Sequence, residues 1–293
     1  MNTKYKYKKI DAFTSGTSLG NPAACLYLSS GESLCDNIML DIAKRHKGFV
    51  SEVVYCSSSD DGIKLTYYSS EREVDFCGHG TIACMYSLIK NDPYLLAQQE
   101  IYIDTNRKGK LTVYNQISEK DAVLIASPDP VYIGTQLSID QIAENLGLFS
   151  KDLNTELPID LIDAGLRTLV VPIGDLETVK SFYPDEHELK EFCVKYDIDI
   201  ILVYSMETAE KNNIAHTRVF APKFGYLEDP ATGSGNSSFG YYMLKNGLWD
   251  KSDCVIEQGG NDRIFNKVSL SYKNSAVLFG GSATVRIDGV YIV

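Results

Sequence analysis

One short pattern occurs twice in this chain and constrains its fold more than any other feature. Cys77-Gly78-His79-Gly80 and Thr232-Gly233-Ser234-Gly235 each place a Gly-x-Gly turn before a segment with helical periodicity, and both glycines recur at a distance of 155 residues. Apolar residues after the first turn follow the spacing of a helix packed on a sheet: Ile82, Met85, Tyr86 and Ile89. The sequence therefore predicts two related halves, each with a turn that leads into a helix.

Short β-branched or aromatic runs, bounded by Gly, Ser and Asp, dominate the remainder and predict strands. In the first half these are 10–13, 24–28, 49–55, 63–68 and 71–76, and in the second half 121–130, 169–173, 198–204, 217–220 and 268–272. Further helices are expected at 36–46 with Asp36 as N-cap, after a capping box at Ser138 and Gln141, and at 186–196. We expect an α+β protein with an N-terminal lobe at 1–118, a C-terminal lobe at 119–281, and a last strand, 282–293, that returns to the first lobe.

The composition is that of a globular protein with an acidic surface. Of 293 residues 44% are hydrophobic, which excludes disordered and collagen-like chains, and the formal net charge is −11. Nucleic acid and anionic membranes both favour clustered basic residues, so neither is expected as a partner. One basic cluster, at Lys4, Lys6, Lys8 and Lys9, is predicted to be the solvated face of a first strand, and no apolar run is long enough to span a membrane.

Cysteine and histidine usage argues against disulfides and metal catalysis. The cysteines number seven and include no Cys-x-x-Cys pair, and the four histidines show no His-x-x-x-His or Glu-x-x-His spacing. Disulfide frameworks and zinc motifs typically have such patterns. We therefore expect a reduced, cytoplasmic, metal-free protein that uses no cofactor.

Glu52 is the first candidate for chemistry, because it lies in a predicted strand on the same face as Val50 and Val54. A carboxylate between two valines is either solvated or partly desolvated, and desolvation would make it a better general base. Charged strand residues are more often structural, so this segment alone favours a solvated or salt-bridged glutamate.

The two Gly-x-Gly turns are candidate anion sites, because a turn that opens a helix presents backbone N–H groups at the positive end of the helix dipole. Cys77 precedes the first turn, where a helix N-terminus would favour the reactive thiolate, although a small buried cysteine is an equal alternative. His79 is expected either to contact substrate or to cap the helix, and Asp229 either to orient substrate or to cap a turn before Pro230.

Taken together, these motifs resemble the phenazine-biosynthesis PhzF-like isomerase family. The matching segments occur in the family's order along essentially the whole chain: Asp11-Ala-Phe-Thr14, Gly20-Asn-Pro-Ala23, Ser51-Glu52, Asp75-Phe-Cys-Gly-His-Gly-Thr81, Gly165-Leu-Arg-Thr-Leu-Val-Val-Pro172, Arg218-Val-Phe-Ala-Pro222, Glu228-Asp-Pro-Ala-Thr-Gly-Ser-Gly235, Gln258-Gly259 and Gly280-Gly281. The ordered set is far more specific than any one motif.

The resemblance implies a diaminopimelate epimerase-like fold with two pseudo-symmetric lobes, each a β-sheet wrapped around a central helix, and an active site in the cleft between them. It makes Glu52 the catalytic acid/base, which takes a proton from carbon and returns it elsewhere on a small anionic metabolite. It implies a homodimer and places the remaining site residues in substrate binding: His79, Asp229, Gly78, Gly80, Gly233, Ser234 and Gly235.

Two departures from the wider superfamily's pattern matter. The epimerases of that superfamily resemble enzymes with two catalytic cysteines, one thiolate before each turn. Here Cys77 stands before the first turn but Thr232 before the second, and its hydroxyl group is far too weak an acid to replace a thiol. Many PhzF-like sequences also have Ala where this chain has Gly80 or Gly235, which gives a roomier turn. The leading hypothesis is thus a single-glutamate isomerase; a Cys77-dependent epimerase or racemase and a non-catalytic metabolite-binding protein remain as alternatives.

Overall fold

The structure is a computed structural model that describes residues 3–29, 32–59, 62–261 and 264–293. The chain divides into two units, Met1–Ala126 with Gly280–Val293, and Ser127–Phe279. The first unit extends to Ala126 rather than to the expected 118, because β8 (Ala122–Ala126) pairs with β7 (Gly109–Gln116) of that unit. None of the helices in the described residues is both long and apolar enough to cross a membrane.

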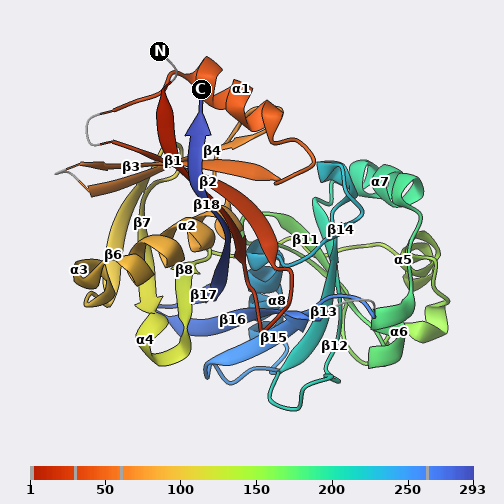
Figure 1. Cartoon of the computed structure of the whole chain (residues 1–293). Helices are drawn as coiled ribbons and strands as arrows, with labels where there is room; N and C mark the ends of the chain where they lie inside the picture. The colour runs from red at the N-terminus through yellow and green to blue at the C-terminus, as the bar shows by residue number, and fades with distance from the viewer. Residues whose placement is uncertain (1–2, 30–31, 60–61, 262–263) are drawn as a thin grey trace. The chain divides into compact units, whose positions relative to one another are not determined.

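The first unit is built on one sheet with the strand order β18-β1-β2-β3-β4-β6-β7-β8, and β5 lies beside the end of β4. Neighbours are antiparallel except for the parallel pairs β2/β3 and β4/β6. The C-terminal strand β18 runs along β1, as Figure 1 shows. The remaining bounds are β1 Lys4–Ala12, β2 Asn21–Leu28, β3 Glu52–Ser59, β4 Gly62–Ser69, β5 Glu73–Val74, β6 Glu100–Thr105 and β18 Ala283–Ile292, with helices α1 Asp36–Arg45, α2 Gly78–Asn91, α3 Pro93–Leu96 and α4 Ile117–Lys120.

The second unit repeats this pattern of pairs with the order β9-β10-β11-β12-β13-β15-β16, and β14 lies beside the end of β13. The parallel pairs are now β11/β12 and β13/β15, at the equivalent places. Its elements are β9 Val131–Tyr132, α5 Ile139–Leu146, η1 Ser150–Asp152, β10 Asp160–Asp163, β11 Arg167–Pro172, α6 Leu176–Ser181, α7 Glu186–Lys195, β12 Ile200–Ser205, β13 Ala215–Phe220, η2 Pro222–Phe224, β14 Glu228–Asp229, α8 Gly233–Lys245, β15 Cys254–Gln258, β16 Asn266–Lys273 and β17 Ala276–Gly281, which runs across the unit boundary in the chain. The expected fold of two similar lobes is confirmed.

A buried helix follows the Gly-x-Gly turn in each unit. α2 contacts β1, β2, β3, β8 and β18, and every residue from Gly80 to Ser87 is buried. α8 contacts β10, β11, β12 and β16, and every residue from Gly235 to Met243 is buried. Small side chains in both helices allow strands to pack on all sides, so the sheet wraps around the helix instead of covering a single stripe.

The outer helices follow the predicted patterns closely. α1 buries Met39, Ile42 and Ala43 in a cluster with β1, β2 and β3, and α7 buries Leu189, Phe192 and Cys193. The capping box of α5 forms as predicted, because Ser138 and Gln141 exchange hydrogen bonds. The expected N-cap of α1 was wrong: Cys35 holds the extended N-cap position, and Asp36 is the first helical residue.

The basic cluster of the first strand is only partly solvated, which corrects the expectation for Lys8. Lys4 and Lys6 are exposed, whereas Lys8 is buried. Its ammonium group donates to Ser87 Oγ of α2 at 3.0 Å and lies 3.4 Å from Asp288 of β18. The charge on Lys8 is therefore compensated inside the fold, because the central helix and the last strand supply polar partners.

Candidate active site

Glu52 is the first residue of β3 and is held by both neighbouring strands of the sheet. It pairs with Ala23 of parallel β2 and with Ser69 of antiparallel β4. Its side chain is 21% exposed, so the carboxyl group is partly desolvated but still accessible. Pairing on both sides fixes the backbone of Glu52 and so limits where its side chain can lie.

The N-terminus of α2 is formed by the first Gly-x-Gly turn. Cys77 is the N-cap, with extended φ and ψ of −134° and 104°, and its buried thiol group accepts a hydrogen bond from the Gly80 N–H at 3.3 Å. Thr81 Oγ1 donates to the Cys77 carbonyl at 2.8 Å. The thiol therefore takes the capping role that Ser or Asp usually has, and the N–H that it caps stabilises negative charge on sulfur.

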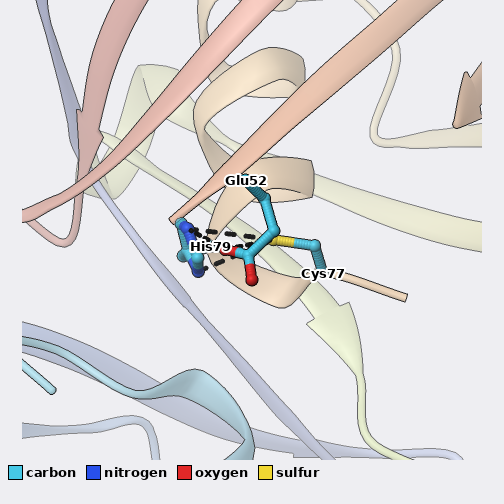
Figure 2. A group of neighbouring side chains, drawn as sticks. All are labelled: Glu52, Cys77 and His79. Atoms are coloured by element: carbon cyan, nitrogen blue, oxygen red, sulfur yellow. Dashed lines mark hydrogen bonds and ion pairs between the residues drawn. The ribbon is translucent and has the colours of Figure 1, made fainter. Parts of the chain in front are cut away.

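The structure brings Glu52, Cys77 and His79 together in one cluster, which Figure 2 shows. Glu52 Oε2 lies 3.3 Å from His79 Nε2, and the Cys77 thiol donates to the same oxygen over 3.8 Å. The sulfur is 3.6 Å from His79 Nδ1 and 3.8 Å from Nε2. A carboxyl group, an imidazole and a thiol thus lie within contact of one another at the start of α2.

His79 is neutral at physiological pH. Burial lowers its pKa to about 4, and the hydrogen bond from the ring to the Pro22 carbonyl, which acts in the opposite direction, is the weaker effect. A neutral imidazole has one donor and one acceptor nitrogen, and its donor is used at the Pro22 carbonyl, so the other nitrogen can accept a hydrogen bond from a protonated Glu52 or from a ligand.

The second turn is built differently, although the backbone is the same. Thr232 is the N-cap of α8, with φ and ψ of −122° and 104°, but its side chain makes no capping hydrogen bond. Its hydroxyl group donates to the buried Asp229 carboxylate instead. Gly233, Ser234 and Gly235 then open the helix, with Ser234 the most accessible of the three.

A buried amide network supports this second turn and was not predicted. Gln258 Oε1 accepts hydrogen bonds from the Thr232 N–H at 3.0 Å and from Asn236 Nδ2 at 2.8 Å, and Gln258 Nε2 donates to the Asp229 carbonyl at 2.8 Å. The repeat in the sequence does indicate that Asn236 is equivalent to Thr81, because it lies 155 residues after it. Both side chains bond to the carbonyl of their N-cap residue, at 2.9 Å and 2.8 Å.

The expected site residues therefore form one group in each unit. Glu52, Cys77, Gly78, His79 and Gly80 belong to the first unit and lie at β3 and the start of α2. Asp229, Gly233, Ser234 and Gly235 belong to the second and lie at β14 and the start of α8. In both units a two-residue strand runs into the turn, β5 before α2 and β14 before α8, again 155 residues apart.

Comparison with known proteins agrees with this architecture. Residues 10–289 match the family described as phenazine biosynthesis-like protein, PhzC-PhzF. An uncharacterized isomerase of Bacillus subtilis, YfhB, is 28% identical over 288 residues, which cover 97% of this chain and 94% of that protein. An uncharacterized isomerase of Clostridium acetobutylicum is 26% identical over 255 residues, covering 85% of this chain and 82% of that protein.

Solved structures show the same fold. The phenazine biosynthesis protein of the PhzF family from Bacillus anthracis superposes with a TM-score of 0.85 at 24% identity, and the match covers 99% of both chains. A hydroxyproline epimerase from Agrobacterium vitis, solved with trans-4-hydroxy-L-proline, superposes with a TM-score of 0.57 at 11% identity, over 99% of this chain and 91% of that one. With its two repeated lobes and a family match over almost its whole length, the chain belongs to the phenazine biosynthesis-like PhzF family of isomerases.

Proposed function

We propose that this protein is a cofactor-independent isomerase that moves a proton between carbons, or between faces of one carbon, of a small carboxylated metabolite. Glu52 is the acid/base in this proposal. The observation that carries it is the position of the Glu52 carboxyl group, partly exposed and in contact with His79 and Cys77 at the N-terminus of α2.

The reaction requires a base, a stabiliser for negative charge, and the return of the proton. Glu52 takes a proton from a carbon that a neighbouring carbonyl, carboxylate or alkene has made acidic. Backbone N–H groups at a helix N-terminus stabilise the resulting negative charge. Glu52, now protonated, delivers that proton to another carbon or to the other face, and no other reactant is consumed.

Two features favour Glu52 over Cys77 as the base. The Cys77 thiol is buried and is already used as the cap of α2, where it accepts the Gly80 N–H. The equivalent cap in the second unit is Thr232, which carries no thiol. A Cys77-dependent reaction remains the second candidate, because the sulfur contacts both Glu52 and His79.

The polar groups suggest which ligands the protein binds. We propose that His79, Gly78 and Gly80 in the first unit, and Asp229, Gly233, Ser234 and Gly235 in the second, contribute to substrate binding. Helix N-termini favour a carboxylate, whereas the Asp229 carboxylate favours a hydroxyl or ammonium group. The Agrobacterium vitis epimerase was solved with a small hydroxy amino acid.

The test is a screen of small carboxylated metabolites for solvent deuterium incorporation. We expect the wild-type protein to exchange at least one carbon-bound proton, and the Glu52→Gln variant to lose roughly 100-fold or more in rate, as for removal of a general base. Cys77→Ala separates the candidates, because it retains exchange only if Glu52 is the base. Near-normal exchange in Glu52→Gln would reject the assignment, and binding without exchange in the wild type would show a non-catalytic binding protein.

A further inference from the structure

We propose that Glu52, Cys77 and His79 form a three-ligand site for Zn²⁺, and that the bound ion inhibits the isomerase by occupying its base. Zinc binding itself goes beyond the proposed function, and only the inhibition depends on it. Within the described part of the chain, these three residues are the one group of three or more His, Cys, Asp or Glu side chains whose donor atoms all lie within 4.8 Å of one another.

The spacing of the donor atoms fits tetrahedral zinc. Bonds of about 2.0 to 2.3 Å at tetrahedral angles place nitrogen and oxygen ligands about 3.3 Å apart, and sulfur about 3.5 to 3.6 Å from either. The observed distances are 3.3 Å between His79 Nε2 and Glu52 Oε2, 3.8 Å between Sγ and Oε2, and 3.6 to 3.8 Å between Sγ and the ring nitrogens. Sγ is almost equally far from both ring nitrogens, whereas a coordinating ring points one lone pair at the ion. Binding therefore requires the His79 ring to turn, in addition to shifts of a few tenths of an ångström.

The donor types also suit zinc, which binds thiolate, imidazole and carboxylate ligands. The charges of a thiolate and a carboxylate balance those of Zn²⁺ and offset the unfavourable positive end of the α2 dipole. Three protein ligands leave the fourth position open to water or substrate, and the Glu52 and His79 side chains are 21% and 14% exposed.

Neighbouring backbone groups already form hydrogen bonds with two of the three ligands. The Gly80 N–H donates to the Cys77 sulfur at 3.3 Å, and the His79 ring donates to the Pro22 carbonyl. A hydrogen bond of this kind on one ring nitrogen leaves the lone pair of the other for a metal. The cap therefore holds the Cys77 sulfur in place before an ion arrives, while the His79 ring still has to turn.

The second unit offers an internal contrast. At the position equivalent to Cys77 it has Thr232, whose hydroxyl group is bonded to Asp229. A neutral hydroxyl is a poor zinc ligand compared with a thiolate. We therefore expect one zinc site for each chain, at the start of α2.

The experiment measures metal binding on the full-length protein directly. Zn²⁺ is titrated against a chromophoric chelator, and Co²⁺ is added separately, because a cobalt–thiolate bond gives a characteristic near-ultraviolet absorption. We expect one Zn²⁺ per chain with a Kd in the micromolar range or tighter, a Co²⁺ spectrum typical of tetrahedral coordination with sulfur, and loss of affinity on the order of 100-fold in Cys77→Ala and His79→Gln.

Matched controls use residues of the same types away from the cluster. Cys35→Ser removes an exposed thiol and His187→Gln an exposed imidazole, and both should bind zinc like the wild type. His79→Gln keeps the proposal testable if Cys77→Ala fails to fold. Absence of stoichiometric Zn²⁺ binding, or unchanged affinity in His79→Gln, would overturn the site.

Inhibition is read separately from binding. Deuterium exchange is measured with a chelator present and then with added Zn²⁺, and we expect the ion to suppress exchange competitively with substrate. If Glu52→Gln keeps deuterium exchange in the presence of the chelator but no longer binds zinc, then Glu52 is not the base, and the proposed zinc site is still supported. Exchange that continues at saturating Zn²⁺ would overturn the inhibition.

Discussion

Glu257 is a charged side chain without exposed surface, and its carboxylate is surrounded by donors. His216 Nδ1 lies 2.8 Å from Oε1, and the N–H groups of Ala209 and Glu210, together with Asn213 Nδ2, donate to the carboxylate. The other nitrogen of His216 lies 2.8 Å from the Gly259 carbonyl. This network holds the end of β15 next to Gln258, which supports the second turn.

The pKa of Glu257 makes this network a source of pH-dependent stability. Burial alone would raise that pKa, but the hydrogen bonds from His216, Ala209 and Asn213 hold it below the ordinary value of 4.5. A carboxyl group with a depressed folded-state pKa contributes stability above its unfolded pKa, and this contribution is lost as the pH falls through the folded value. We expect Glu257→Gln to lower the free energy of unfolding by about 2 to 4 kcal/mol at pH 7. The variant should also lose less stability than the wild type as the pH falls below 4.5.

Urea unfolding between pH 3 and pH 8 measures both effects. Glu210→Gln is the matched control, because the Glu210 side chain is exposed and pairs at the surface with Lys267, while its backbone N–H still reaches Glu257. It should follow the wild-type profile within about 0.5 kcal/mol. Parallel pH profiles for wild type and Glu257→Gln would contradict the assigned role of the carboxylate.

The helix starts give a prediction at the scale of elements, because equivalent glycines have different surroundings. A Cβ at Gly80 would lie 2.7 Å from Val54 Cγ2 and 2.9 Å from Cys77 Sγ, and both groups are held in place. A Cβ at Gly235 would meet Ile200 at 3.2 Å and Thr232 Cγ2 at 3.3 Å, which is tight but tolerable. The better helix propensity of Ala contributes up to about 1 kcal/mol at either position.

We therefore expect Gly80→Ala to destabilise the protein by about 1 to 2 kcal/mol and Gly235→Ala to be close to neutral. Gly80→Ala should also displace the Cys77 sulfur and weaken zinc binding, whereas Gly235→Ala should not. The two variants are compared by thermal unfolding and by zinc titration. Equal stability and equal zinc affinity would show that the start of α2 is not as tightly packed as the structure indicates.

Elements were more predictable than the contacts among them. The apolar spacing at Ile82 and Met85 and the capping box at Ser138 are local signals, and the structure forms both helices. The burial of Lys8 is not local, because it depends on Ser87 and Asp288 from distant parts of the chain. The same holds for Gln258, whose partners reach it only when β15 lies beside β13.

The sequence motifs for metal sites do not include the proposed zinc ligands, for a similar reason. Such motifs place ligands a few residues apart on one element, as only Cys77 and His79 do here. Glu52 comes from β3, 25 residues earlier, and reaches the turn through strand pairing. The sequence therefore indicated the chemistry of each residue, whereas tertiary packing determines which of these residues are in contact.

At the scale of the whole molecule, the duplication explains why the last strand belongs to the first unit. Strands β1–β9 and β10–β18 form two consecutive sets. The final strand of each set pairs with the first strand of the other set, β9 with β10 and β18 with β1. β9 therefore completes the second unit and β18 the first. β18 is much the longer, and it runs along β1 from Lys4↔Ile292 to Ala12↔Ala283.

Because β18 completes the sheet around α2, its removal should unfold the first unit selectively. Deleting 283–293 removes the pairing along β1 and the hydrogen bonds from Arg286 to Asp11 and to the Ser18 carbonyl. At about 1 kcal/mol for each hydrogen bond, this loss is comparable to the whole stability of a domain. Hydrogen exchange should then show lost protection in α2 but retained protection in α8, while a control that lacks only 292–293 stays protected in both. Equal loss in α2 and α8 would mean that the two units unfold as one cooperative body.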